Sequence, residues 1–194
     1  MPKVSRDAII SAAIQLFNRN GYHATSMRDI AREVAIQKPS LYHHFDGKED
    51  ILLAILDAGM EQFTRDMEAI AASDDACTTK LRAAIHAHAR LIADNPDGAA
   101  VFLREDRGLG DAYLQHYVAQ RDRVEQFFRA IVQQGIQEGV FRAADVTIVT
   151  HALLGMVNWM TRWYRPEGRL DAGQIADIFF DLFLYGIEQP ARDA

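Results

Sequence analysis

The 194-residue sequence contains very little cysteine and no long apolar run. Its one cysteine, Cys77, rules out a disulfide within the chain and fits a reducing compartment. No stretch reaches the ~18 uninterrupted apolar residues of a membrane span, and the N-terminus has no apolar run of signal-peptide length. We therefore expect a soluble, cytoplasmic protein that has no membrane partner.

The sequence also lacks the motifs of common catalytic and metal sites. It has no phosphate-binding glycine loop and no hydrolase elbow, and no motif fixes a base beside Cys77. The pairs His43–His44 and His86-x-His88 do not share a helix face, and no cysteine or carboxylate completes a ligand set. We expect surface or hydrogen-bonded histidines, no metal, no cofactor and no enzyme activity. An all-helical enzyme with clustered titratable groups remains an alternative, as does a plain dimeric interaction module.

Positive charge is scarce, and the net charge of −6 is unevenly distributed. Residues 1–50 carry seven basic and six acidic residues, a net charge of +1. Residues 51–194 carry fourteen basic and twenty-one acidic residues, a net charge of −7. Bulk charge is therefore weak support for nucleic-acid binding, and the spacing of individual groups must carry that case.

Helical periodicity runs through most of the chain, and no alternating strand pattern of any length occurs. Apolar residues make up 49% of the sequence, enough for a substantial core. The fold class that we predict is all-α, with about nine helices. We expect helices over about residues 5–20, 38–45, 48–72, 78–93, 111–138, 144–164 and 171–188. A further short helix is expected to begin at residue 26, and another to lie around residues 101–103.

Residues 25–50 predict a short helix, a tight turn, a second short helix and the start of a third. In the second of these helices Leu41 and Phe45 form an i, i+4 pair on one face. The outer face keeps hydrogen-bonding groups: Lys38, Pro39, Ser40, Tyr42, His43 and His44. A small helix of this kind suits insertion into a DNA major groove, which predicts a helix-turn-helix regulator.

Four blocks in this region carry a family resemblance. FNRNGY from Phe17, TSMRDIA from Thr25, PSLYHHF from Pro39 and KEDIL from Lys48 resemble the N-terminal signature of the TetR family of bacterial transcriptional regulators. The resemblance covers about residues 5–56. It implies a three-helix DNA-binding domain over residues 1–47 and a larger helical effector-binding and dimerisation domain over residues 48–194. It also implies a homodimer that represses from a palindromic double-stranded operator.

The resemblance further implies roles for individual residues. Ser26 and Arg28 would meet phosphates or a base edge, and Tyr42, His44 and Lys48 would meet phosphates. Base edges would be read by Lys38, Pro39, Ser40 and His43. These residue types suit the task, because basic side chains neutralise phosphates and a tyrosine hydroxyl can hold a phosphate oxygen.

Three positions depart from the family pattern. Ala35 stands where the turn usually has glycine, so an unfavourable backbone angle is expected there. Gln37 stands where a capping serine is common, so the second helix is expected to fray more. His43 stands where the family often has a larger aromatic residue, so the bases that this protein prefers in its operator are not determined by the pattern.

The last two helices of the chain are strongly apolar. The helix that begins near residue 171 is apolar nearly all round, which fits either a central core helix or a dimer interface. Family resemblance favours the interface, in which helix pairs from two subunits form a four-helix bundle.

Residues 158–169 combine aromatic side chains with arginines. Trp159, Arg162 and Trp163 would share a helix face, which fits arginines snorkelling beside core aromatics or an effector site with a cationic mouth. The block resembles a TetR branch that responds to acyl-CoA in lipid or steroid breakdown, so the effector would be an acyl-CoA or another amphipathic anion. A regulator of an efflux gene with a cationic multidrug ligand is the alternative. The candidate effector residues are Phe63, Met67, Phe102, Tyr113, Tyr117, Phe128, Asn158, Trp159, Arg162, Trp163 and Arg165.

Overall fold

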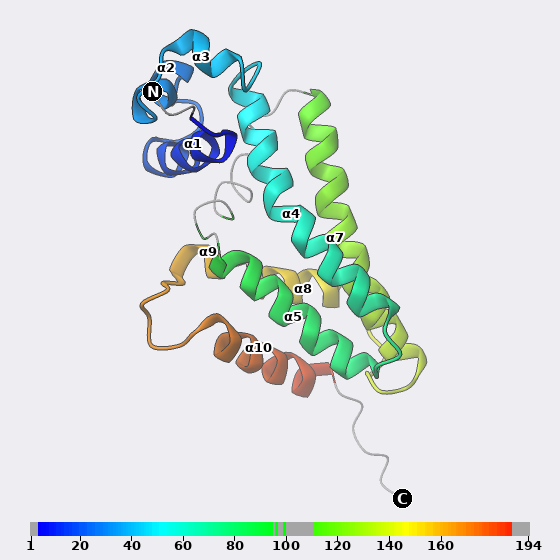
Figure 1. Ribbon diagram of the computed structural model, residues 1–194. Coiled ribbons are helices and arrows are strands. Elements are labelled where there is room, and N and C mark those ends of the chain that lie inside the picture. Colours follow the sequence, from blue (N-terminus) through cyan, green and yellow to red (C-terminus); the bar gives the residue numbers. More distant parts are fainter. Residues whose placement is uncertain (1–3, 95, 97–98, 100–110, 188–194) are drawn as a thin grey trace, which may run out of the picture. The chain divides into compact units, whose positions relative to one another are not determined.

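The structure is a computed structural model that describes residues 4–94, 96, 99 and 111–187. The described residues fold into helices without a β-strand, which confirms the all-α prediction. The helices, labelled as in Figure 1, are α1 (Arg6–Asn20), α2 (Met27–Glu33), α3 (Lys38–Tyr42), α4 (Lys48–Ala72), α5 (Cys77–Asp94), α7 (Asp111–Gln137), α8 (Val146–Asn158), α9 (Met160–Trp163) and α10 (Ala172–Ile187). Of these, none combines the length and apolar character needed to cross a membrane.

The chain packs as two compact units. The first holds Met1–Met60 and Asn95–Ala119, and the second holds Glu61–Asp94 and Gln120–Ala194. Helix α4 is one continuous helix with residues in both units. The expected functional division at residue 47 remains a prediction.

Helices α1, α2, α3 and the first part of α4 bury one apolar cluster in the first unit. Phe17, Ile30, Leu41 and Phe45 lie in it, as the apolar stripes of the sequence predict. Helix α1 is capped at its start by Ser5, whose hydroxyl accepts from the backbone N–H of Ala8 at 3.1 Å. It ends at Gly21, whose φ of 85° lies in the left-handed region that glycine tolerates.

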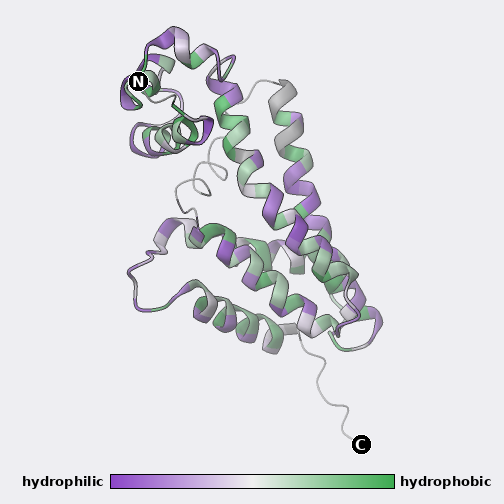
Figure 2. Ribbon diagram, in the orientation of Figure 1, coloured by the Kyte–Doolittle hydropathy of each residue, from purple (hydrophilic) through white to green (hydrophobic). Residues whose placement is uncertain are grey.

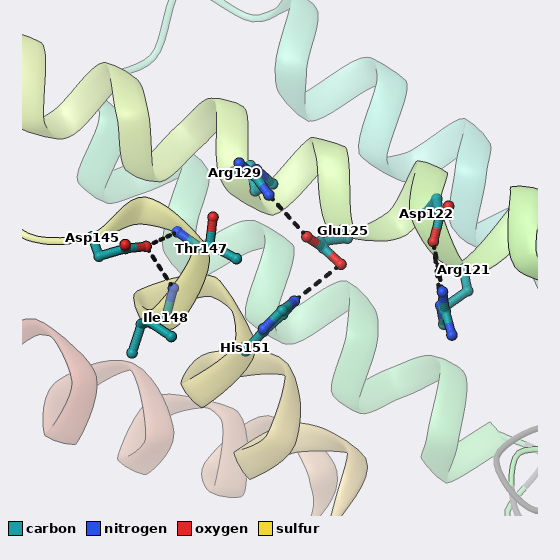
Figure 3. A network of polar contacts seen from close by, with 8 residues as sticks. All are labelled: Arg121, Asp122, Glu125, Arg129, Asp145, Thr147, Ile148 and His151. Atoms are coloured by element: carbon teal, nitrogen blue, oxygen red, sulfur yellow. Dashed lines mark hydrogen bonds and ion pairs between the residues drawn. The ribbon is translucent and has the colours of Figure 1, made fainter.

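In the second unit, α10 lies alongside α5, and both contact α8 (Figure 1). Helices α7 and α8 are tied by Glu125, whose carboxylate accepts from Arg129 at 3.1 Å and pairs with His151 at 3.2 Å (Figure 3). The same view shows Asp145 capping α8 by accepting from two backbone N–H groups at its start. These contacts fix the helices that surround the core of this unit.

The region expected to form one helix over residues 144–164 is broken at Trp159 into α8 and α9. At this junction the Thr161 hydroxyl donates a hydrogen bond to the backbone carbonyl of Asn158 at 2.8 Å. Such a local bond competes with the helical ladder, so periodicity alone does not reveal the break. The predicted helix around residues 101–103 lies outside the described residues.

Candidate functional site

Helix α2 is held at its start by a reciprocal capping box. Ser26 Oγ accepts from the backbone N–H of Asp29 at 3.3 Å, and the Asp29 carboxylate accepts from the backbone N–H of Ser26 at 3.0 Å. Hydrogen bonds from the Ser26 side chain and backbone hold the pKa of Asp29 below its ordinary value. Ser26 and Asp29 stand three residues apart, which is the spacing of such a box, and Arg28 is exposed in the first turn of this helix.

The turn between α2 and α3 is made by Ala35, whose φ is +56°. An L-residue with a Cβ costs roughly 1–2 kcal/mol in this region of backbone space, which confirms the unfavourable angle expected where glycine is usual. The turn closes with the backbone N–H of Ile36 donating to the carbonyl of Ala31 at 2.9 Å.

Helix α3 buries Leu41, with Phe45 buried just beyond its end, and turns its other side chains outward. Lys38, Pro39, Ser40, Tyr42 and His43 are exposed, and His44 is half-buried. The helix ends at Tyr42 rather than near residue 45, and Gln37 makes no side-chain capping bond at its start.

Ion pairs distinguish the basic side chains of this unit. Arg32 pairs with Asp29 at 3.0 Å, and Arg19 lies 3.8 Å from Glu33. In contrast, Arg28 and Lys38 make no ion pair with any residue that the structure describes. Lys38 Nζ instead lies 5.6 Å from the centre of the Tyr42 ring, one turn along α3. Two cations are thus presented at the starts of α2 and α3.

Lys48 occupies a position that its sequence block did not reveal. Its Nζ donates to the backbone carbonyl of Tyr22 at 2.6 Å and to that of Thr25 at 2.9 Å, and lies 4.2 Å from the centre of the Tyr22 ring. The Thr25 hydroxyl is buried and donates to the carbonyl of Gly21 at 2.9 Å. The first residue of α4 is therefore fastened to the segment that joins α1 and α2.

The core of the second unit contains a buried histidine, His88 on α5. Its ring lies between those of Phe63 on α4 and Phe128 on α7, with centroid distances of 5.3 Å and 5.8 Å. Burial lowers the pKa of His88 to about 4, against the opposing effect of the Asn158 side chain. His88 fits the hydrogen-bonded alternative that the sequence predicted, because the Asn158 side chain bonds to its ring, although Nδ1 has no partner among the described residues. Its place on the stripe Leu81, Ala84, Ile85, His88, Ile92 was the available signal.

The candidate effector residues separate into buried and exposed groups. Phe63, Met67 and Phe128 are buried, and Asn158 is half-buried beside His88. Exposed at the surface are Trp159, Arg162, Trp163 and Arg165. Phe102 and the side chains of Tyr113 and Tyr117 lie outside the described residues.

An open groove of about 520 Å³ separates the second half of α4 from α5. Two of its basic side chains are already engaged, since Asp177 on α10 accepts from Arg82 at 2.6 Å and pairs with His86 at 2.8 Å. The Arg82 guanidinium also lies over the Phe180 ring. These contacts join α5 to α10.

Helices α8 and α10 expose large apolar side chains. Trp159 is 63% exposed, and Tyr185 is 78% exposed. The other members are Ile148, Ile178 and Leu182. Figure 2 shows hydrophobic colour along α10, interrupted by hydrophilic residues. This set of exposed apolar side chains is called here the α8–α10 face.

Known proteins match both parts of the chain. Residues 9–55 match the family described as bacterial regulatory proteins, tetR family, and residues 74–187 match the tetracyclin repressor-like C-terminal domain. The HTH-type transcriptional repressor KstR2 of Mycolicibacterium smegmatis is 28% identical over 195 residues, covering 99% of this chain and 95% of that protein.

Solved structures agree with these matches. The TetR family regulator PfmR from Thermus thermophilus is 36% identical with a TM-score of 0.85, covering 93% of this chain and 99% of that one. AibR, solved in complex with isovaleryl coenzyme A and operator DNA, is 30% identical with a TM-score of 0.81, covering 91% and 96%. The helix-turn-helix geometry and these matches lead to one conclusion: the chain belongs to the TetR family of DNA-binding transcriptional regulators and is not an enzyme.

Proposed function

We propose that the protein is a cytoplasmic homodimeric repressor that leaves a palindromic operator when it binds a small amphipathic effector. The observation that carries this proposal is α3, which buries Leu41 alone and presents its remaining side chains to solvent. A five-residue helix with so little packing is explained by a partner that its outer face contacts. Repression is also the activity named for the KstR2 relative.

In this proposal some exposed side chains of α2 and α3 contact bases and others contact phosphates. Lys38, Pro39, Ser40 and His43 meet base edges, where lysine can donate to guanine and a histidine or serine can exchange hydrogen bonds. Tyr42 and His44 contact phosphates, as do Ser26 and Arg28 at the start of α2. Because bulk positive charge is small, these placed contacts and dimer geometry supply the affinity.

Lys48 has a different proposed task from the phosphate contact implied by the family pattern. Its ammonium group already lies against backbone carbonyls, so its donors are directed into the protein. We assign it as a positioning residue that holds the start of α4 to the segment before α2. A change in α4 would then be passed to α2 and α3 through this contact.

The α8–α10 face supports the homodimer. Ile148 and Trp159 share one side of α8 with the exposed small residues Ala152 and Gly155, and small residues allow a second helix to approach closely. A second copy of the same two helices would cover this face in a four-helix bundle. The dimer would set two copies of α3 about one DNA turn apart, ~34 Å.

The effector that we favour is an acyl-CoA or a related amphipathic anion. The exposed arginines Arg162 and Arg165 offer donors for phosphate, and AibR was solved with isovaleryl coenzyme A. A cationic multidrug ligand would call for a buried carboxylate. The buried polar side chains in the described part of the second unit are Lys80, His88 and Thr150, none of them a carboxylate.

The switch follows from thermodynamic linkage. An effector that prefers one orientation of α4 shifts the protein toward that state, and only by its differential affinity for the two states. Because α4 continues from the second unit to Lys48, its movement would alter the spacing of the paired α3 helices.

The test is selection of bound DNA from a random pool, followed by titration of the selected DNA with a panel of metabolites that includes acyl-CoA thioesters. Enrichment of a palindrome and its release by one thioester are expected. Failure to enrich any sequence would refute operator recognition, whereas enrichment without release by any thioester would refute the effector class alone.

A further inference from the structure

The basic side chains of residues 1–50 differ in whether they already have partners within the chain. Arg19 and Arg32 pair with carboxylates, and the Lys48 ammonium group lies against backbone carbonyls. Three cations of this segment make no ion pair with any residue that the structure describes: Arg6, Arg28 and Lys38. Of these three, Arg6 is the one that the proposed function leaves without a role.

Arg6 lies beside the end of α3, although it belongs to another helix. It is the first residue of α1, and its guanidinium carbon Cζ lies 4.6 Å from the centre of the Phe45 ring. Phe45 is buried and follows the last residue of α3, Tyr42, by three positions. A guanidinium at this distance from a ring makes a cation–π contact. The start of α1 is therefore held against the chain that leaves α3.

The N–H donors of the Arg6 guanidinium are unused within the described part of the chain, where no hydrogen bond or ion pair engages them. The adjacent acid, Asp7, stands at i+1, and such neighbours do not face each other on a helix. The Phe45 ring takes up one face of the guanidinium, whereas the donors point outward in its plane. Because Arg6 is exposed, these donors can reach a group outside the chain.

A structural role explains only part of this arrangement. The long side chain of Arg6 covers an aromatic ring of the core, which basic side chains commonly do. A neutral side chain would also cover the ring, and it would suit the first turn of α1 better, since the helix dipole disfavours a cation there. The positive charge of Arg6 is therefore explained by an anion that the described residues do not supply.

We propose that Arg6 binds a phosphate of the DNA backbone beside the bases that α3 contacts, with one face of its guanidinium on the Phe45 ring and its N–H edge on the phosphate. This inference rests on the proposed function, in which α3 enters the major groove. A guanidinium can donate two parallel hydrogen bonds to phosphate oxygens, and stacking restricts its orientation. The contact adds α1 to the DNA interface and fixes position without reading sequence.

The experiment measures the affinity of the full-length protein for a duplex enriched from a random pool, at several salt concentrations from about 50 to 200 mM. Arg6→Met keeps a flexible apolar cover on Phe45 and removes the charge. It should bind roughly tenfold more weakly for each subunit, and the slope of log affinity against log salt should fall by about one per subunit. The loss should be equal on a duplex with substituted bases, because phosphates carry no sequence information.

Arg19→Met is the matched control, because it removes an exposed, ion-paired arginine from the other end of the same helix. It should keep the wild-type slope. Arg6→Gln is a second neutral variant and should reproduce the reduced slope, so that a folding defect in Arg6→Met alone does not decide the result.

Neutral methylphosphonates, placed at one backbone position of the duplex at a time, locate the contact. One position in each half-site should weaken binding by wild type and leave binding by Arg6→Met unaffected. Equal penalties for both proteins at every position overturn the inference, as does a wild-type slope in both neutral variants, while the proposed function stands. Absence of wild-type binding to every duplex overturns the proposed function and this inference together.

Discussion

The first unit exposes basic and polar side chains on a small helix, whereas the second unit buries a polar side chain in its core. In the first, Tyr42 and Lys38 are exposed on α3, and the core below them is purely a support. In the second, His88 is part of the core itself. The first unit therefore keeps its exposed polar groups apart from its core, whereas in the second unit a polar group is part of the core.

This difference predicts how each unit tolerates change. Surface residues of α3 can be replaced with little loss of folding free energy, because they are not packed. A change at His88 alters packing and desolvation together. This difference can be tested with variants that lower the stability or the binding function of one unit and leave the other unit unchanged.

The largest effect is expected from matched core truncations, Leu41→Ala in the first unit and Leu153→Ala in the second. Both leucines are 0% exposed, so each variant should lose about 2–5 kcal/mol of unfolding free energy in its own unit. Leu41→Ala should abolish operator binding and leave a dimer that still binds effector. Chemical denaturation, gel shift and sedimentation measure these three properties. Loss of the dimer in Leu41→Ala would contradict the separation of the units.

The next effect concerns pH and His88. Its pKa is about 4 in the folded protein and about 6.5 when unfolded, so the unfolded state binds more protons between these values. Stability should therefore fall as pH is lowered from 6.5 to 4, by about 3 kcal/mol from this group. Urea titrations at several pH values should show a smaller loss in His88→Phe. Parallel pH profiles for both proteins would contradict a buried, neutral imidazole.

The sequence predicted the first unit well because its determinants are local. Ser26 and Asp29 are three residues apart, and Leu41 and Phe45 are four apart, so helix geometry alone places them. Ala35 was expected to adopt a strained angle because it stands where the family pattern usually has glycine, and its φ is +56°. The DNA contacts assigned to individual side chains remain predictions.

Local sequence patterns could not predict the contacts between residues far apart in the chain. The carbonyls that hold Lys48 belong to residues 23 and 26 positions earlier in the chain. The rings around His88 come from α4 and α7, and only the packing of these helices brings them together. The break at Trp159 was missed because the apolar period continues through it. Sequence pattern therefore identified the buried stripes but not which stripes meet.

Lys48→Met tests a positioning role against a phosphate contact. Loss of the charged hydrogen bonds should cost roughly 1–3 kcal/mol of stability in the first unit and weaken operator binding. The slope of log affinity against log salt should stay unchanged, because no counterion-releasing contact is removed. Arg28→Met is the matched control and should reduce that slope by about one. A reduced slope for Lys48→Met would indicate instead that Lys48 contacts a phosphate.

The smallest effect is expected at the turn. Ala35→Gly should relieve the left-handed strain, partly offset by the greater freedom of glycine in the unfolded chain, and stabilise the first unit by about 0.5–1 kcal/mol. Thermal unfolding measures the gain, with Ala31→Gly, inside α2, as a control that should destabilise. A loss of stability in Ala35→Gly would show that the strain is compensated by contacts of its methyl group.

In the proposed function, the exposed face of α3 binds DNA and the α8–α10 face holds the dimer. The most direct measurement is the affinity of Tyr42→Ala and Tyr185→Ala for the selected operator at fixed salt, with sedimentation of each variant. Tyr42→Ala should bind roughly tenfold more weakly and remain fully dimeric, because its side chain is exposed and contributes no core packing. Tyr185→Ala should weaken the dimer and lose operator affinity only where it dissociates. Unchanged operator affinity in Tyr42→Ala would contradict the account.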